Sequence, residues 1–191
     1  MSLAYELDDY KVEIHNGVEV AMAPSPGVNH NIVVKNIVRF FDTYLKGKPC
    51  MVFTDGLDVK LSGKDKFIPD VMVVCKKDII KHDGIYGAPD LVVEVLSPGT
   101  AKYDKGYKRK MYAFHGVREF WTIDPLNRTI ETHILVDGHY DLMDIIFIPH
   151  YYSHYENEVE KCGIEVVTEF SPAIFPEMLI QVAEVFEGCL E

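Results

Sequence analysis

The 191-residue sequence lacks long apolar runs. None approaches the roughly 18 consecutive residues that a membrane-spanning helix needs, so we expect no membrane insertion. Its N-terminus also lacks a basic region followed by an apolar segment, the pattern typical of a secretory signal. We therefore expect a cytoplasmic protein.

Several motifs of common enzyme classes are absent as well. There is no phosphate-binding glycine loop, no dinucleotide fingerprint and no Gly-x-Ser-x-Gly elbow, which disfavours nucleotide-driven and serine-hydrolase chemistry. Cysteine is sparse, and no two cysteines form a Cys-x-x-Cys pair, which argues against a zinc knuckle or a redox motif. We expect reduced structural thiols at all four positions, Cys50, Cys75, Cys162 and Cys189.

Positive charge is scarce over most of the chain. The formal net charge is −11, which does not fit a broad nucleic-acid-binding surface. One exception is the segment from Lys102 to Lys110, which holds five basic residues and a single aspartate. A local basic spot on an acidic body favours focused contact with phosphate over a long binding groove.

What is present is an alternation of strands, hairpins and helices. A length of 191 residues and 48% hydrophobic residues are typical of one domain with a substantial core, so we predict a single domain over residues 1–191. A hairpin is expected at Asp8 to Ala23, because alternating strands flank the turn pair Asn16-Gly17. Asn29 is expected to cap a helix that runs to about Lys46.

The second half of the chain gives further elements. We predict strands at Lys66 to Cys75, Ala88 to Ser97 and Glu119 to Asp124, a helix at Ala101 to Phe114, a hairpin over 129–148 with its turn at Asp137-Gly138, and a closing helix at Phe175 to Glu187. Residues 75–88 are polar, and we expect them to be mostly irregular. This mixture indicates an α+β (mixed α/β) fold in which a central mixed sheet is flanked by helices, with N-terminal and C-terminal hairpins.

Two carboxylates interrupt apolar strands. Asp70 and Glu94 lie within apolar segments that are expected to be buried. A buried carboxylate needs a cation, a hydrogen-bonded partner or water. If the two strands are neighbours, these oxygens suit Mg²⁺ or Mn²⁺ better than zinc. Asp104, Lys108 and Tyr112 are spaced by four and form one helical stripe that can face them. The same pattern also fits a structural alternative, in which Glu94 and Lys108 form a buried ion pair and the basic segment is a solvated face.

These residues resemble a known family. Pro69-Asp70 followed by Glu94-Val95-Leu96 resembles the PD-(D/E)xK nuclease superfamily, whose members have a restriction-endonuclease-like fold. The longer context is similar to the Uma-type family of proposed endonucleases, and the similarity covers nearly the whole chain. The segments that carry it are Gly87 to Thr100, Tyr103-Asp104, Lys108, Tyr112, Gly116-Val117 and Glu119 to Pro125, with Glu13, Asn16-Gly17, Met22 to Ser25, His30 and the Phe175-Pro176 segment.

The resemblance implies roles for individual residues. Asp70 and Glu94 would hold a Mg²⁺ or Mn²⁺ ion, with the Val95 carbonyl as a third oxygen ligand. The superfamily pattern has lysine where this chain has Leu96, and Lys108 on the following helix matches the position thought to supply the missing charge. Three auxiliary candidates follow from the resemblance. Tyr112 matches a related helix motif, Glu13 would bind a second metal ion or orient water, and His30 would contact a phosphate or the leaving group.

Two functions remain open at this point. The first is a Mg²⁺-dependent endonuclease acting on nucleic acid, with DNA favoured over RNA. Homodimerisation fits this function, because cutting both strands needs two sites, and it fits the second function as well. The second is a catalytically silent protein that keeps the fold as a binding or assembly module.

His150 and His154 are spaced by four, but the residues around them favour a solvated or stacking role over metal binding.

Overall fold

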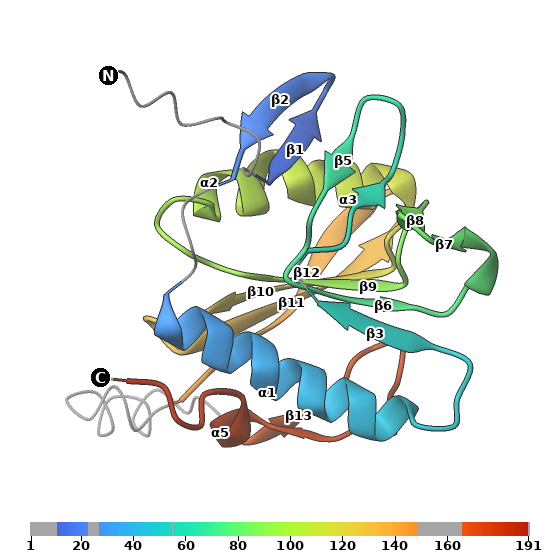
Figure 1. The fold of residues 1–191 in the computed structure, drawn as a ribbon. Coiled ribbons are helices and arrows are strands. Elements are labelled where there is room, and N and C mark those ends of the chain that lie inside the picture. The colour runs from blue at the N-terminus through green and yellow to red at the C-terminus, as the bar shows by residue number, and fades with distance from the viewer. Residues whose placement is uncertain (1–10, 23–26, 55, 149–165, 191) are drawn as a thin grey trace, which may run out of the picture.

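A six-stranded mixed sheet forms the centre of the molecule, with helix α1 on one face and the helical segment α2 to α3 on the other (Figure 1). The computed structural model describes residues 11–22, 27–54, 56–148 and 166–190. In spatial order the strands are β12 (His139–Phe147), β11 (Thr129–Val136), β10 (Glu119–Asp124), β9 (Leu91–Val95), β6 (Val71–Val74) and β3 (Met51–Thr54). β9 and β10 run parallel, and the other neighbouring pairs are antiparallel.

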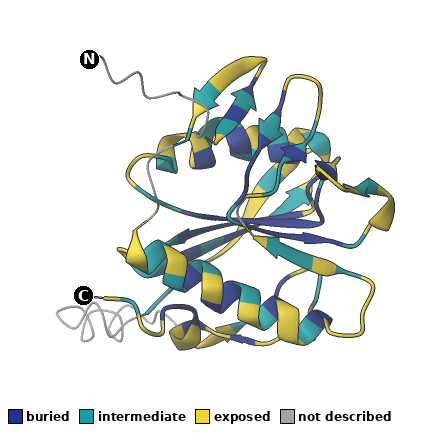
Figure 2. Ribbon diagram, viewed as in Figure 1, coloured by how far each residue is buried: buried dark blue, intermediate teal, exposed yellow. Residues whose placement is uncertain are grey.

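Burial on both faces explains the composition of the inner strands. Every residue of β6 and of β9 is buried, and Figure 2 shows this centre of the sheet in the buried colour. Strands covered by helices on both sides read as continuous apolar runs and do not alternate. A charged residue such as Glu94 in β9 is therefore held inside the molecule between the sheet and the helix above it.

A second sheet of short strands stands beside the helical segment (Figure 1). In spatial order it contains β2 (Val18–Ala21), β1 (Val12–His15), β5 (Lys66–Phe67), β4 (Val59–Lys60), β8 (Gly84–Tyr86) and β7 (Ile80–Lys81). The predicted N-terminal hairpin is confirmed, because Asn16 and Gly17 take the positive φ values of 50° and 79° that a tight turn needs. The C-terminal hairpin of β11 and β12 is confirmed in the same way by Asp137 and Gly138.

Helix α1 (Val28–Leu45) packs one apolar stripe on the central sheet. Its buried residues are Val33, Asn36, Ile37, Phe41 and Leu45, which recur at the spacing of one helical face. The expected helix at this place is confirmed, with its start within two residues of the expected one and its end within one. The expected cap is wrong, because Gly27 is the N-cap and the Asn29 side chain instead bonds the backbone N–H and carbonyl of Leu190.

The helix on the other face has three parts. It begins as α2 (Ala101–Tyr103), continues as a π-helical turn, η2 (Asp104–Lys108), and ends as α3 (Arg109–His115). Gly116 ends it in the left-handed conformation, with φ 87°. The π-turn was not foreseen, because the residue pattern of a π-helix does not differ from that of an α-helix over so few residues.

The C-terminal segment differs from the expected closing helix. It holds β13 (Glu169–Phe170), β14 (Ile180–Gln181) and only a short α5 (Val182–Val185). The buried carboxylate of Glu119 accepts hydrogen bonds from the backbone N–H groups of Ala173 and Ile174. This contact ties Ala173 and Ile174 to the start of β10, and the chain then makes two turns, Pro172 to Phe175 and Phe175 to Met178, before β14 begins.

Residues 75–88 are also more regular than the sequence suggests. After the short 3₁₀ turn η1 (Lys77–Ile79), strands β7 and β8 complete the second sheet. Gly84 makes this possible, since its φ is 148° and a Cβ there would lie 2.6 Å from the Asp58 carbonyl oxygen. The partner of β8 is β4, some 25 residues earlier in the chain, so no local pattern reveals the pairing.

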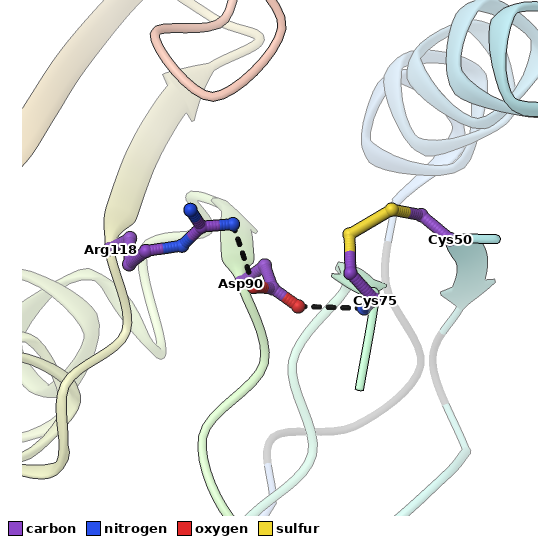
Figure 3. Close-up of a disulfide and its surroundings, with 4 residues drawn as sticks. All are labelled: Cys50, Cys75, Asp90 and Arg118. Carbon is purple, nitrogen blue, oxygen red and sulfur yellow. Dashed lines mark hydrogen bonds and ion pairs between the residues drawn. A yellow bond between two sulfur atoms is a disulfide. The ribbon is translucent and has the colours of Figure 1, made fainter. Parts of the chain in front are cut away.

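The expectation of reduced thiols is wrong for two cysteines, because Cys50 and Cys75 form a disulfide (Figure 3). The strand register explains the pairing: Met51 lies opposite Val74 in β3 and β6, so the next residues outward face each other. The Cys75 N–H donates to Asp90, whose other oxygen accepts a 2.7 Å bond from Arg118. Cys189 is a free thiol.

Within the described ranges, no helix is long and apolar enough to cross a membrane. His150, His154 and Cys162 lie outside the described residues.

Candidate active site

Asp70 lies where the chain leaves the second sheet and enters the central one. It follows buried Ile68 and Pro69, directly before β6 begins. Its Oδ2 accepts a 2.7 Å hydrogen bond from the backbone N–H of Val95, at the end of β9. The side chain remains 15% exposed, so this carboxylate stands at the edge of the buried region and can be reached from solvent.

Lys108 brings the other charged residues together. Its ammonium lies 2.7 Å from Glu94 Oε1, 3.1 Å from Glu13 Oε1 and 3.2 Å from Asp104 Oδ1, and its side chain is only 4% exposed. The three carboxylates come from β9, from β1 and from the helix that carries Lys108. A buried lysine that bridges two sheets and a helix is an expensive arrangement unless its charge is fully paired.

The π-turn and Tyr112 complete the helical side of the site. In η2 the backbone N–H of Arg109 bonds the carbonyl of Asp104, five residues earlier, which widens the turn. π-turns inside α-helices are frequent at functional sites. One turn further on, the buried hydroxyl of Tyr112 donates a 2.8 Å hydrogen bond to Glu94 Oε1, the same oxygen that contacts Lys108.

The N-terminal hairpin supplies Glu13. Its Oε1 accepts a 2.9 Å bond from the Ile68 N–H and also contacts Lys108, while its Oε2 lies 2.9 Å from His15 Nε2. His15 is held by aromatic rings, stacked on Tyr107 with 5.3 Å between centroids and edge-on to Phe67 at 5.1 Å. This packing fixes the hairpin against the helix and with it the position of Glu13.

His30 reaches the site from the first turn of α1. Its Nε2 lies 3.1 Å from Asp70 Oδ1, and its side chain is 12% exposed. The two oxygens of Asp70 are thus contacted by different elements, one by α1 and one by β9. His30 and Asp70 are the more exposed members of the cluster, and they mark the side from which a ligand would enter.

The carboxylates in this cluster strongly affect one another. Burial raises the pKa of Glu94 well above its ordinary value; the Lys108 charge opposes this, and the charges of Asp104 and Asp70 add to it. Burial likewise raises the pKa of Asp104, again against the effect of Lys108. The pKa of Glu13 behaves differently: burial alone would raise it, but the charge of Lys108 and the hydrogen bond with His15 lower it to about 2.

Burial alone would lower the pKa of Lys108, but Glu94, Glu13 and Asp104 together raise it well above its ordinary value. Lys108 is therefore a permanent cation at working pH. Burial and the Glu94 charge raise the pKa of Tyr112, so its hydroxyl stays a proton donor. More negative charge gathers here than one lysine neutralises, which is the electrostatic setting of a cation site.

The structure places every sequence-nominated residue in this one region. Lys108 and Tyr112 both contact Glu94, and Asp70 is joined to the end of the same strand through the backbone N–H of Val95. Glu13 contacts Lys108, and His30 contacts Asp70. Two further members were not nominated, Asp104 and His15. The signal for Asp104 was its spacing of four from Lys108, whereas His15 could have been found only through its alternation with Glu13 on one strand face.

Asp70 and Glu94 are the carboxylates best placed to hold a metal ion, since the Asp70 to Val95 hydrogen bond joins their strands. In the described part of the chain, however, no three His, Cys, Asp or Glu side chains are already arranged as a metal cluster. A bound ion would have to complete its coordination with backbone oxygen and water. Mg²⁺ commonly does so, because it usually keeps several waters.

A family model with the description "Putative restriction endonuclease", named Uma2, matches residues 2–152. The chain belongs to the Uma2 family. A solved structure described as a putative nuclease belonging to DUF820 from Anabaena variabilis ATCC 29413 has the same fold, with a TM-score of 0.70 over 94% of this chain and 91% of that one. At 18% sequence identity this likeness concerns the fold alone.

A relative from Synechocystis sp. (strain ATCC 27184 / PCC 6803 / Kazusa), "Uncharacterized protein slr1290", is 34% identical over 86 residues. That match covers 44% of this chain and 45% of the relative, less than half of either protein. Uma2 membership and the shared nuclease fold confirm the family and the restriction-endonuclease-like architecture predicted from the sequence. The cluster around Lys108 lies entirely within the residues that match the family model.

Proposed function

We propose that this Uma2 protein hydrolyses phosphodiester bonds of DNA with the help of Mg²⁺ or Mn²⁺ held by Asp70 and Glu94. The observation that supports this best is the buried Lys108 ammonium, shared by three carboxylates beside Asp70. A simple core would avoid such a cluster, since burying several carboxylates around one cation carries a large desolvation cost. Functional sites are where groups with strongly perturbed pKa values gather.

The residues present fit such an ion. Its ligands would be Asp70, Glu94 and the Val95 carbonyl, all oxygen donors of the kind that Mg²⁺ and Mn²⁺ prefer. The raised pKa of Glu94 reflects burial and an excess of negative charge, and a divalent cation would relieve that excess. When bound, the ion would lower the pKa of a coordinated water and polarise a phosphate oxygen.

The protein's own groups have separate tasks in this proposal. Lys108, which stays protonated, would stabilise negative charge that develops on the phosphate, a preorganised charge of the kind that contributes most to catalysis. Tyr112 holds Glu94 by its 2.8 Å hydrogen bond, and Glu13 holds Lys108 from the hairpin side. His30, against Asp70 and partly exposed, is placed to contact the incoming phosphate or the leaving group.

The test uses Asp70→Asn, which keeps the shape of the side chain and its ability to accept the Val95 hydrogen bond but removes the charge. The matched control is Asp83→Asn, which removes a charge from an exposed ion pair with Lys60 in the second sheet. Plasmid DNA cleavage is measured with Mg²⁺, with Mn²⁺ and with EDTA. Binding of Mn²⁺ alone is measured by calorimetry, and folding by thermal melting.

We expect the parent protein and Asp83→Asn to cleave DNA only with the metal ion. Asp70→Asn should bind Mn²⁺ more weakly and cleave on the order of 100-fold or more slowly, with a melting temperature close to that of the parent. Equal cleavage by the two variants would overturn the assignment of Asp70. Cleavage that survives EDTA would overturn the role of the metal ion.

A second candidate is a catalytically silent binding or assembly module. The observation in its favour is that three ion pairs already surround Lys108, as they would in a purely structural cluster. Under this alternative the parent protein cleaves neither DNA nor RNA with either ion, and it binds Mn²⁺ no more tightly than Asp70→Asn does.

A further inference from the structure

A cavity of about 580 Å³ lies between α3 and the β12 end of the central sheet, apart from the carboxylate cluster. Cavities of roughly 300 to 1,000 Å³ are typical of small-ligand sites. The residues that line it are Lys105, Arg109, Lys110, Met111, Ala113, Phe114, Gly138, His139 and Tyr140. Helix and hairpin thus contribute opposite walls.

The lining is positively charged on a protein whose formal net charge is −11. Three cations face the cavity, and no carboxylate belongs to its lining among the residues that the structure describes. Lys105 is tied to Glu131 by a 2.7 Å ion pair. Arg109 and Lys110 make no ion pair or hydrogen bond to side chains in the described ranges, so both remain available to an anion.

The wall opposite the cations is rigid and aromatic. The Tyr140 ring stacks on Phe120 with 5.5 Å between centroids, and its hydroxyl donates a 2.8 Å hydrogen bond to the Val117 carbonyl. Tyr140 is thereby fixed in place by the core. A ligand that enters the cavity therefore meets a surface that is formed in advance, which reduces the entropy lost on binding.

Phe114 is the most exposed large hydrophobic side chain in the described ranges, with 75% of its surface accessible. It lies one helical turn after Lys110, on the same side of α3, and both line the cavity. An exposed aromatic ring beside unpaired cations suits a nucleotide, whose base stacks on the ring while its phosphate contacts the cations.

We propose that this cavity binds one unpaired nucleotide of a nucleic-acid strand, with the phosphate on Arg109 and Lys110 and the base stacked on Phe114. The proposal rests on the proposed function in taking nucleic acid as the substrate. Lys108 faces the carboxylate cluster, and Arg109, the next residue, lines this cavity. A strand anchored here would lie against the same helix that forms one wall of the candidate active site.

The experiment measures binding without cleavage. A short fluorescein-labelled oligothymidylate and an abasic strand of the same length are titrated with protein in EDTA, and binding is followed by fluorescence anisotropy. Thymidine monophosphate serves as a competitor, to separate a strand site from a site for free nucleotides. The variants are Phe114→Ala and Arg109→Ala.

The matched controls are Leu126→Ala, which removes an apolar side chain of similar exposure (71%), and Lys81→Ala, which removes an exposed cation from the second sheet. Because Phe114 is so exposed, its removal should not affect folding. We expect Phe114→Ala to bind oligothymidylate roughly 5- to 100-fold more weakly and the abasic strand within about twofold of the parent. Arg109→Ala should weaken both strands, and the controls neither.

Equal affinity of Phe114→Ala and Leu126→Ala for oligothymidylate would overturn the proposal, as would equal binding of the two strands by the parent. Competition by thymidine monophosphate at the concentration that oligothymidylate itself requires would assign the cavity to free nucleotides and overturn the strand site. The proposed function and this site can fail separately. If Phe114→Ala weakens binding but no variant cleaves DNA with the metal ion, the proposed function fails and this site remains. If the protein cleaves DNA but Phe114→Ala binds as the parent does, only this site is overturned.

Discussion

At the scale of single residues, Lys108 is the buried cation that holds three carboxylates together. Its three carboxylate partners come from separate elements, so the ion pairs join β1, β9 and the helix at one point. A buried charge that loses a partner costs about 3 to 5 kcal/mol, far more than an exposed pair contributes. Stability and proposed chemistry therefore depend on the same side chain.

Glu13 gives the clearest test of this coupling. The pKa of Glu13 is about 2 in the folded protein and 4.5 in the unfolded chain. The ionised carboxylate therefore stabilises the fold fully above about pH 4.5. That stabilisation is lost as the pH falls from 4.5 toward 2. We expect Glu13→Gln to lower the free energy of unfolding by about 3 kcal/mol at pH 7, with a smaller loss at pH 3.5, as measured by urea denaturation.

The control is Glu19→Gln, an exposed carboxylate on the other strand of the same hairpin. It should change the free energy of unfolding by less than about 0.5 kcal/mol at either pH. A loss in Glu13→Gln that does not depend on pH would show that Glu13 acts by packing and not through its charge.

At the scale of elements, the helix from Ala101 to His115 contains one glycine, Gly106, and is followed by a second, Gly116, and the two have opposite conformational requirements. Gly106 lies in the π-turn, and a Cβ there would meet nothing within 4 Å. Gly116 ends the helix at φ 87°, a conformation that L side chains rarely adopt. Glycine is therefore required by the backbone conformation at position 116 and is not required at position 106.

We expect Gly106→Ala to raise the free energy of unfolding by about 0.4 to 1 kcal/mol, since alanine reduces the freedom of the unfolded chain at no steric cost. Gly116→Ala should lower it by about 1 kcal/mol, because alanine is strained at positive φ. For a chain of this length each kcal/mol shifts the melting temperature by roughly 2 to 4 °C, so calorimetry resolves both. Shifts of the same sign would contradict the assigned conformations.

At the scale of the whole molecule, the disulfide joins the segment between α1 and edge strand β3 to the end of the neighbouring strand β6. Cys50 follows α1 and precedes β3, and Cys75 follows β6, so the bridge closes a loop of 25 residues (Figure 3). This loop includes Asp70, whose oxygen contacts His30 of α1. The bridge thus limits how far the end of α1 can move from β6, the strand that Asp70 directly precedes.

We expect Cys50→Ser to lower the free energy of unfolding by about 3 kcal/mol, from the loop-closure entropy that the bridge removes from the unfolded chain. The melting temperature should then fall by roughly 6 to 12 °C. Dithiothreitol should destabilise the parent to the same extent and leave Cys50→Ser unchanged. Cys189→Ser, at a free thiol, is the control. A parent protein insensitive to dithiothreitol would show that the two thiols are not bridged in solution.

The sequence by itself determined the elements whose signals are local. Asn16-Gly17 and Asp137-Gly138 specify tight turns because they accept positive φ, and both hairpins form as predicted. The apolar stripe of α1 follows from its helical periodicity, and strand Glu119–Asp124 is marked by its own run of residues, closed by Pro125. The motif residues carried enough information to predict the family and fold, because Asp70 and Glu94 interrupt strands that otherwise read as core.

The tertiary structure decided what depends on partners distant in the chain. The pairing of β8 with β4, the contact of Glu119 with Ala173 and the bridge between Cys50 and Cys75 join segments that lie far apart in the sequence, so no local pattern predicts them. In the candidate site, spacing put Lys108 on the right helical stripe, but only packing showed that Glu13 reaches it from the hairpin. Local propensity acts over a few residues, whereas burial and charge pairing are set by whatever the folded chain brings into contact.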